Sequence, residues 1–168
     1  QSDYDFFLIN QIGRFENVHL IYGSGVDTSH FIPNTTRQNS TSVRVLMASR
    51  ILVDKGVREY IEAIQSKRLQ GKKIHFLLAG QPDSGNPSSI DPVEITSWDR
   101  ITGFEYLGHV DDMAELLNSV DVFVLPSYRE GLPRSLLEAA ACALPIVTTD
   151  VPGCNEVVID EFNGLLVS

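Results

Sequence analysis

Residues 121–149 read DVFVLPSYREGLPRSLLEAAACALPIVTT, and the order of patterns within this stretch decides the fold. Residues 121–125 and 145–149 are short apolar runs with the length and composition typical of buried strands. Residues 134–143 lie between them and are rich in leucine and alanine, which favour a helix that Pro145 ends. This helix is apolar on almost every side, so we expect it to be buried. A strand, a helix and a strand in this order predict a βαβ unit.

The rest of the chain repeats the same alternation. Further apolar runs of strand length lie at 18–22, 43–49, 74–79, 104–107 and 165–167, and helical patterns lie at 57–69 and 111–119. Runs that are apolar on both faces are typical of strands in a parallel sheet covered by helices on both sides. The sequence therefore predicts an α/β fold, a doubly wound Rossmann-like parallel sheet flanked by helices.

The chain divides into a short lead-in and one domain. Its 168 residues match the usual length of a single domain, and 43% hydrophobic residues suffice for a sizeable core. We expect residues 1–17 to be a helix or linker from an N-terminal domain outside this chain. Residues 18–168 then form the Rossmann-like domain, cut short at its C-terminal end. Residues 81–89 (QPDSGNPSS) predict an exposed, mobile loop, and Gly153 predicts a turn before a short helix.

Charge and composition exclude several classes of function. The net charge is −9, and residues 85–168 carry 14 acidic but only 3 basic groups, which argues against a nucleic-acid partner. The sequence has no run of about 18 apolar residues, the length that a transmembrane helix needs. The two cysteines and four histidines show no metal-ligand spacing, so we expect no metal site. A complete dinucleotide fingerprint, a P-loop and a nucleophile elbow are all missing.

In an open α/β sheet, ligands bind beyond the carboxyl ends of the strands, and three loops are placed there. The first loop follows residues 43–49 and carries Arg50 and Lys55 just before a helix. Two cations beside a helix N-terminus suit a phosphate group. Two ordinary surface cations would give the same pattern. The third loop, residues 149–156, is either a ligand loop or a plain connecting turn.

The second loop follows residues 121–125 and holds most of the candidates. Gly131 permits close approach of a ligand to the backbone. The free N–H groups of Leu132, Arg134 and Ser135 are expected to point out of the helix start. Arg134 in a first turn is unfavourable against the helix dipole unless an anion lies nearby.

Glu138 lies more than one turn inside this apolar helix, where burial of an unpaired carboxylate is costly. Sugar or ribose hydroxyls are suitable partners, because a carboxylate accepts two of them at once. A backbone N–H or a basic side chain would satisfy the carboxylate as well.

Taken together, residues 127–158 (SYREGLPRSLLEAAACALPIVTTDVPGCNEVV) resemble the donor-binding half of glycosyltransferase family 4, which has the GT-B fold. The family signature of two glutamates separated by seven residues is matched by Glu130 and Glu138, and its Glu-Gly-x-Pro start by residues 130–133. An arginine followed by Lys-Gly is matched by Arg50 and residues 55–56. GSGVDTSHFIP, residues 23–33, resembles the family's lead-in to this domain.

The resemblance implies a retaining glycosyltransferase whose C-terminal domain holds a nucleotide-sugar donor, most often UDP-linked. The enzyme would transfer a hexosyl or N-acetylhexosaminyl group to a glycan or lipid-linked acceptor, as in polysaccharide biosynthesis, without cofactor or metal. The acceptor would bind the missing N-terminal domain, so this fragment alone would be inactive. The location implied is cytoplasmic, at the inner face of the membrane, through peripheral association.

The resemblance also assigns a role to each site residue. By resemblance, Arg50 and Lys55 neutralise the diphosphate, and the helix start at Arg134 and Ser135 binds the phosphate. Glu130 holds the sugar hydroxyls, together with the backbone N–H groups of Gly131 and Leu132. Glu138 binds the ribose, and the loop around Val110 contacts the base.

One departure from the family concerns Asn155, where close relatives often carry arginine, so the contact made from that loop is left open. Two other interpretations of the pattern remain. One is a non-catalytic module that binds nucleotide sugars. The other is another GT-B-like enzyme, such as a sugar-phosphate synthase or a sugar epimerase.

Overall fold

The fold is a six-stranded sheet in which every neighbouring pair of strands is parallel. The computed structural model describes residues 3–12, 16, 19, 21, 23, 25–35 and 41–168. The strands run in the order β3-β2-β1-β4-β5-β6. Their bounds are β1 (Val43–Ala48), β2 (Ile74–Ala79), β3 (Phe104–Gly108), β4 (Val122–Leu125), β5 (Ile146–Thr149) and β6 (Gly164–Val167).

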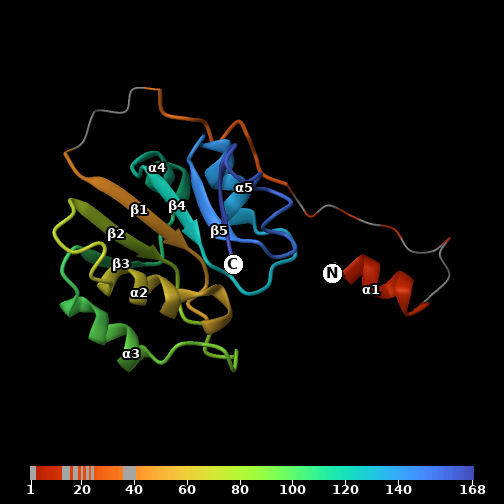
Figure 1. Ribbon diagram of the computed structural model, residues 1–168, viewed down its shortest axis with the longest axis horizontal. Coiled ribbons are helices and arrows are strands. Elements are labelled where there is room, and N and C mark those ends of the chain that lie inside the picture. The colour runs from red at the N-terminus through yellow and green to blue at the C-terminus, as the bar shows by residue number, and fades with distance from the viewer. Residues whose placement is uncertain are drawn as a thin grey trace.

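Helices cover both faces of this sheet. Figure 1 shows α2 and α3 on one side and α4 and α5 on the other. The helices are α1 (Asp3–Ile9), α2 (Val57–Gln65), α3 (Pro92–Ser97), α4 (Met113–Asn118) and α5 (Arg134–Ala141), with short 3-10 turns η2 (Val53–Lys55) and η3 (Trp98–Arg100). This arrangement confirms the predicted doubly wound α/β class.

The six strands of the sheet lie where the sequence predicts strands, but the helices end earlier than predicted. The pattern at 57–69 gives α2 only to Gln65, because Ser66 has an extended backbone (φ −65°, ψ 142°), and Leu69 lies in the following turns. Residues 134–143 give α5 only to Ala141, because Ala143 adopts a left-handed conformation (φ 54°).

The expected complete burial of α5 is wrong. Leu136 and Ala139 are fully buried, whereas the other side chains of the helix are partly or fully exposed. The helix therefore packs one face on the sheet. Its other side carries Arg134, Leu137 and Glu138.

One helix was not anticipated. In α3, the Asp91 carboxylate accepts a hydrogen bond from the Val93 N–H (2.7 Å), and Pro92 occupies the first turn. An N-cap followed by proline is a recognised start signal, so the sequence contained it. Residues 92–97 are too few and contain too few apolar residues to show a helical period, so this helix was not predicted.

Two expected loops differ from prediction. Residues 81–89 are not simply exposed, since Pro82, Asp83, Asn86, Ser88 and Ser89 are partly buried. Residues 152–157 form successive turns in place of the short helix expected after Gly153.

The N-terminal part of the chain tests few expectations. The strand expected at 18–22 falls mostly outside the described residues, and residues 19 and 21 belong to no strand. Helix α1 lies within the predicted lead-in and apart from the sheet in Figure 1. That residues 1–17 lead in from another domain stays a prediction.

The strand order reverses direction between β1 and β4, which are direct neighbours with Val45 opposite Val122. Such a reversal leaves a crevice beyond the carboxyl ends of the two strands, because their connections depart to opposite faces of the sheet. The loops that follow β1 and β4 therefore meet at this crevice. These two loops carry most of the candidate site residues.

Candidate functional site

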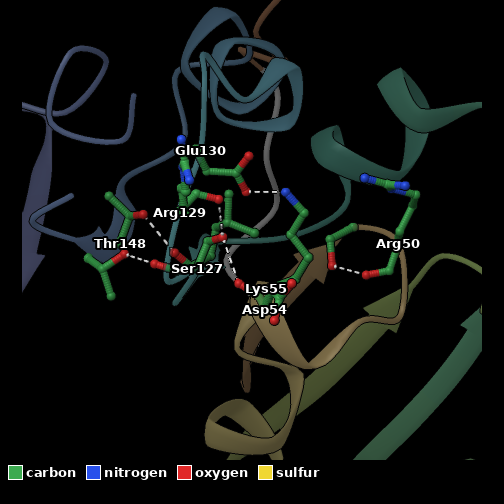
Figure 2. Close-up of polar contacts among 10 residues, drawn as sticks. Arg50, Asp54, Lys55, Ser127, Arg129, Glu130 and Thr148 are labelled. Carbon is green, nitrogen blue, oxygen red and sulfur yellow. Dashed lines mark hydrogen bonds and ion pairs between the residues drawn. The ribbon is translucent and has the colours of Figure 1, made fainter. Parts of the chain in front are cut away.

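The two loops at the strand reversal are joined by a partly buried ion pair. Lys55 comes from the loop after β1, and its Nζ lies 2.7 Å from Oε1 of Glu130 in the loop after β4. Figure 2 shows the two side chains pointing toward each other. Their side chains are only 17% and 9% exposed, so the pair is shielded from most of the solvent. Two residues from separate motifs, 75 positions apart, thus form one unit.

Ser127 ties the backbones of the same two loops together. Its buried hydroxyl shares its proton between the carbonyl oxygens of Asp54 (3.1 Å) and Arg129 (3.2 Å). The Tyr128 N–H donates to the same Asp54 carbonyl at 3.0 Å. The carbonyl of Ser127 accepts a hydrogen bond from the Thr149 hydroxyl at the end of β5. This network fixes the spacing between the loops and so the Lys55–Glu130 pair (Figure 2).

Replacing Ser127 by alanine is expected to lower the free energy of unfolding by about 1–2 kcal/mol, because the buried hydroxyl that bonds to the carbonyls of both loops is lost. Urea unfolding of the chain measures the change. Ser119→Ala is the matched control, since the Ser119 hydroxyl donates to the Leu116 carbonyl of its own helix at an exposed position. Equal midpoints for the two variants would show that the Ser127 hydroxyl does not hold the loops.

Gly153 supports the glutamate loop from the third strand end. Its φ is +85°, and a Cβ built on it would lie 2.3 Å from the Gly131 carbonyl oxygen and 2.9 Å from that of Glu130. The backbone after β5 therefore packs directly against the backbone that carries Glu130. Sequence reasoning treated this glycine only as the start of a turn.

A cavity of about 480 Å³ lies beside the ion pair, at the ends of β1, β2 and β3. Four of the predicted residues line it, and these are Arg50, Val110, Ser135 and Glu138. Lys55, Glu130, Gly131, Leu132 and Arg134 are not part of this lining. The predicted residues therefore do not share one lining: four lie at the cavity, whereas Lys55 and Glu130 meet in the ion pair. The loop of residues 50–55 contributes to both.

Sequence reasoning missed several residues of the cavity wall. Gly80, Gln81, Asp83 and Met113 also line the cavity, as does His109, which belongs to the predicted loop around Gly108–Val110. The position of Gly80 and of residues 81–83 directly after β2 was the available signal, because that strand end lies at the same edge of the sheet.

Glu138 does not stand alone in its helix. Its Oε1 lies 3.4 Å from Nη2 of Arg134, one turn earlier in α5. Burial raises the pKa of the Glu138 carboxyl, and the nearby charges of Arg134 and His30 counteract this in part. The basic partner is one of the two satisfying groups that the sequence left open. The Glu138 carboxylate is in turn the anion that Arg134 requires in the first turn of the helix.

The start of α5 suits an anion. The helix begins after Pro133, which as N-cap residue makes no side-chain hydrogen bond to the first turn. The first N–H groups of a helix lack partners inside it and carry part of the positive end of the dipole. Ser135 in this turn lines the cavity, so the positive helix end is presented to it.

Arg50 is the arginine that lines the cavity, within the described residues. Its Nη1 lies 2.9 Å from Oδ2 of Asp83, and the two side chains are 59% and 37% exposed. Arg50 thus has a carboxylate partner in place of the phosphate that its position suggests.

Within the residues that the structure describes, no cluster of three or more histidine, cysteine, aspartate or glutamate side chains is close enough to hold a metal ion. No helix in this part of the chain has the length and hydropathy needed to cross a membrane.

Similar proteins have known functions in sugar transfer. An N-acetylgalactosaminyltransferase from Campylobacter jejuni, named for its diacetylbacillosaminyl-diphospho-undecaprenol substrate, is 42% identical over 121 residues, covering 72% of this chain and 30% of that protein. The capsular polysaccharide biosynthesis glycosyltransferase CapM from Staphylococcus aureus is 30% identical over 118 residues, covering 70% of this chain and 30% of that protein. The chain therefore spans about 30% of the length of these two relatives.

Solved structures share the fold. A glycosyltransferase from Rickettsia africae superposes with a TM-score of 0.80 at 20% identity, over 99% of this chain and 48% of that one. Anabaena HepE, solved with UDP and glucose, gives 0.77 at 24% identity, over 95% of this chain and 45% of that one.

Residues 42–168, from the residue before β1 to the last residue, match the family described as "Glycosyl transferases group 1". The match includes both loops at the strand reversal, and it confirms the family expected from the two glutamates and the Arg50 and Lys55 motif. The chain belongs to the group 1 glycosyl transferases.

Proposed function

We propose that this chain is the donor-binding domain of a retaining glycosyltransferase that uses a nucleotide sugar. The observation that carries the proposal is the Lys55–Glu130 ion pair beside a cavity lined by Arg50 and Glu138. A cation, a carboxylate and an anion-binding helix start surround one crevice. A nucleoside diphosphate sugar has hydroxyls and a diphosphate at matching positions along its length.

In this proposal, Lys55 serves two partners at once. An ammonium group has three donors, and one of them is taken by Glu130 at 2.7 Å. The remaining donors are available to the diphosphate, together with Arg50. Breaking the bond between the anomeric carbon and the phosphate oxygen builds negative charge on the diphosphate. Preorganised cations at that place lower the barrier.

Glu130 positions the sugar and does not attack it. Its Oε1 accepts from Lys55, which leaves Oε2 to accept sugar hydroxyls, with help from the N–H groups of Gly131 and Leu132. The shared ion pair links sugar binding to diphosphate binding, because movement of either side chain disturbs the other. The proposal includes retention of the anomeric configuration, in which the acceptor attacks the sugar from the same face as the one from which the diphosphate leaves.

Glu138 and the loop after β3 take the nucleoside. The carboxylate of Glu138 accepts the ribose hydroxyls, and the backbone around Val110 contacts the base, since both line the cavity. The N–H groups at Arg134 and Ser135 face the phosphate. No cofactor or metal is needed, because the cations and the helix dipole supply the positive charge.

The donor and acceptor are proposed from relatives. The Anabaena structure contains UDP and glucose, which favours a UDP-linked hexosyl or N-acetylhexosaminyl donor. The name of the Campylobacter relative favours a lipid-linked saccharide as acceptor. The acceptor would bind a part of the protein outside this chain, at the inner face of the membrane in the cytoplasm, through peripheral association.

Ligand-observed NMR with UDP, GDP, ADP and NAD tests the proposal. We expect one nucleoside diphosphate to bind preferentially, and the Arg50→Ala/Lys55→Ala double variant to lose that binding. Preferential binding of NAD would overturn the glycosyltransferase assignment. Product analysis with the complete protein then separates glycoside formation from a synthase or epimerase reaction.

The two glutamates should respond differently to substitution. Glu138→Ala is expected to weaken binding of free UDP about tenfold, because two hydroxyl contacts to a carboxylate are lost. Glu130→Ala should change free-UDP affinity about threefold at most, yet remove the extra affinity of the UDP-sugar. Isothermal titration calorimetry with both ligands measures the difference. If both variants bound UDP and UDP-sugars as the parent does, the site assignment would be wrong.

A further inference from the structure

We infer that Asp83 determines how tightly the cavity holds the diphosphate, because it shares Arg50 with the diphosphate and adds a negative charge beside it. The inference rests on the proposed function, in which Arg50 meets the diphosphate. It adds a carboxylate, absent from the family motifs described above, as a residue that weakens binding.

The geometry places Asp83 in competition with a ligand. Its Oδ2 lies 2.9 Å from Nη1 of Arg50, and both residues line the cavity. One nitrogen of the arginine is therefore already bonded to a carboxylate, which offsets its positive charge toward an anion in the cavity. A diphosphate bound to Arg50 would lie close to the Asp83 carboxylate, and two negative charges that are close together repel each other.

Asp83 is held at the cavity by the loop that carries it. The Asp83 N–H donates to the Ser89 hydroxyl at 3.1 Å, and the Asn86 N–H donates to the Asp83 carbonyl at 2.9 Å. The Val53 N–H donates to the Ser88 carbonyl at 2.8 Å. The aspartate loop is thus joined to the loop of residues 50–55, so Asp83 stays beside Arg50.

The neighbouring charges do not cancel Asp83. The other carboxylate in the cavity wall, Glu138, is paired with Arg134 at 3.4 Å. His109 also lines the cavity, and its Nε2 lies 3.2 Å from Oδ1 of Asp111. Within the described residues, Arg50 is the one arginine or lysine in the lining of this cavity. Asp83 offsets its positive charge.

The penalty should fall more heavily on product than on donor. A free nucleoside diphosphate has one more ionisable oxygen on its terminal phosphate than a nucleotide sugar, where that oxygen is bonded to the sugar. The product therefore carries more negative charge toward Asp83 and Arg50. An aspartate at this place favours release of the nucleoside diphosphate after transfer.

Isothermal titration calorimetry at low salt tests the inference, with UDP, UDP-glucose and uridine as probes. We expect Asp83→Asn to bind UDP about two- to fivefold more tightly than the parent, the range expected for a partly exposed ion pair. The gain should be smaller for UDP-glucose and absent for uridine, which carries no phosphate. Asp83→Ser serves as a second variant, and urea unfolding confirms that both are folded.

Two controls separate the causes. Asp99→Asn removes the same charge from an exposed residue outside the cavity, and it should leave UDP affinity unchanged. In an Arg50→Ala background, Asp83→Asn should give a different gain from that in the parent, because the two side chains interact. An equal gain in both backgrounds would mean that Asp83 does not act through Arg50.

The outcomes distinguish the inference from the proposed function. If Arg50→Ala weakens UDP binding but Asp83→Asn leaves it equal or weaker, the inference fails and the proposed function stands. If parent and Arg50→Ala bind UDP alike, or neither binds, the role of Arg50 is wrong and the inference fails with it.

Discussion

Replacing Lys55 by methionine is expected to lower the free energy of unfolding by about 2–3 kcal/mol, because the Glu130 carboxylate is left without its charged partner. The Glu130 side chain is only 9% exposed, so water cannot fully replace the ammonium group. Removing one partner of a fully buried pair costs more than this. The 17% exposure of Lys55 reduces the loss, since some solvent already reaches the site.

Urea unfolding of the chain measures this loss, and an exposed ion pair gives the control. Arg58 is bonded to Glu94 at 2.9 and 2.8 Å, but the two side chains are 51% and 33% exposed. Arg58→Met should therefore lower the stability far less than Lys55→Met does, because an exposed ion pair contributes little. A loss as small for Lys55→Met would show that the Lys55–Glu130 pair is not shielded from solvent.

The second substitution in a double-mutant cycle tests the cause of the loss. Glu130→Gln in the Lys55→Met background should recover most of the lost stability, because the uncompensated charge disappears. If Glu130→Gln instead lowered the stability further, the unpaired carboxylate would not be the cause. In the complete protein, each single substitution is expected to lower kcat about 10²- to 10³-fold, the usual effect of removing one charge-stabilising group.

The sheet was predictable because its strands are apolar on both faces. Residues 74–79 illustrate this, since every position of β2 is apolar except His75, and no helix period fits the run. Helix ends were not predictable from the same patterns. The periodic spacing at 57–69 continues past Gln65, whereas the chain leaves the helix at Ser66, where the backbone becomes extended.

The candidate site was predictable as a set of residues but not as a geometry. The motifs named Lys55 and Glu130 in separate roles, and no local pattern could show that their side chains meet at 2.7 Å. That contact depends on β1 and β4 being neighbours, which is a property of the strand order. Asp83 was overlooked for the same reason, since a Pro/Gly/Ser loop gives no sign that it lies beside Arg50.

Gly153→Ala is expected to lower the free energy of unfolding by about 3 kcal/mol, from two separate effects. A residue with a Cβ is strained at φ +85°, which costs about 1–2 kcal/mol. The new methyl group would also lie 2.3 Å from the Gly131 carbonyl oxygen, so the backbone after β4 must move. Urea unfolding of the chain gives the total.

Gly71→Ala isolates the first effect. Gly71 has φ +75°, and a Cβ there would meet nothing within 4 Å, so the substitution introduces strain without a steric clash. It should cost about 1–2 kcal/mol. Equal losses for Gly71→Ala and Gly153→Ala would show that the contact with Gly131 yields without cost.

Gly153→Ala should lower kcat more than it weakens the binding of nucleotide. The displaced backbone carries Glu130 and Gly131, which hold the sugar in the proposed function, whereas Arg50 and Glu138 lie on other segments. In the complete protein, a shift of about 1 Å in these groups should lower kcat by about 10²-fold. The dissociation constant of UDP should stay within about twofold of the parent, because the diphosphate and ribose contacts remain. A parallel loss of UDP affinity and kcat would instead mean that the Gly153 contact supports the whole crevice rather than the sugar-binding loop.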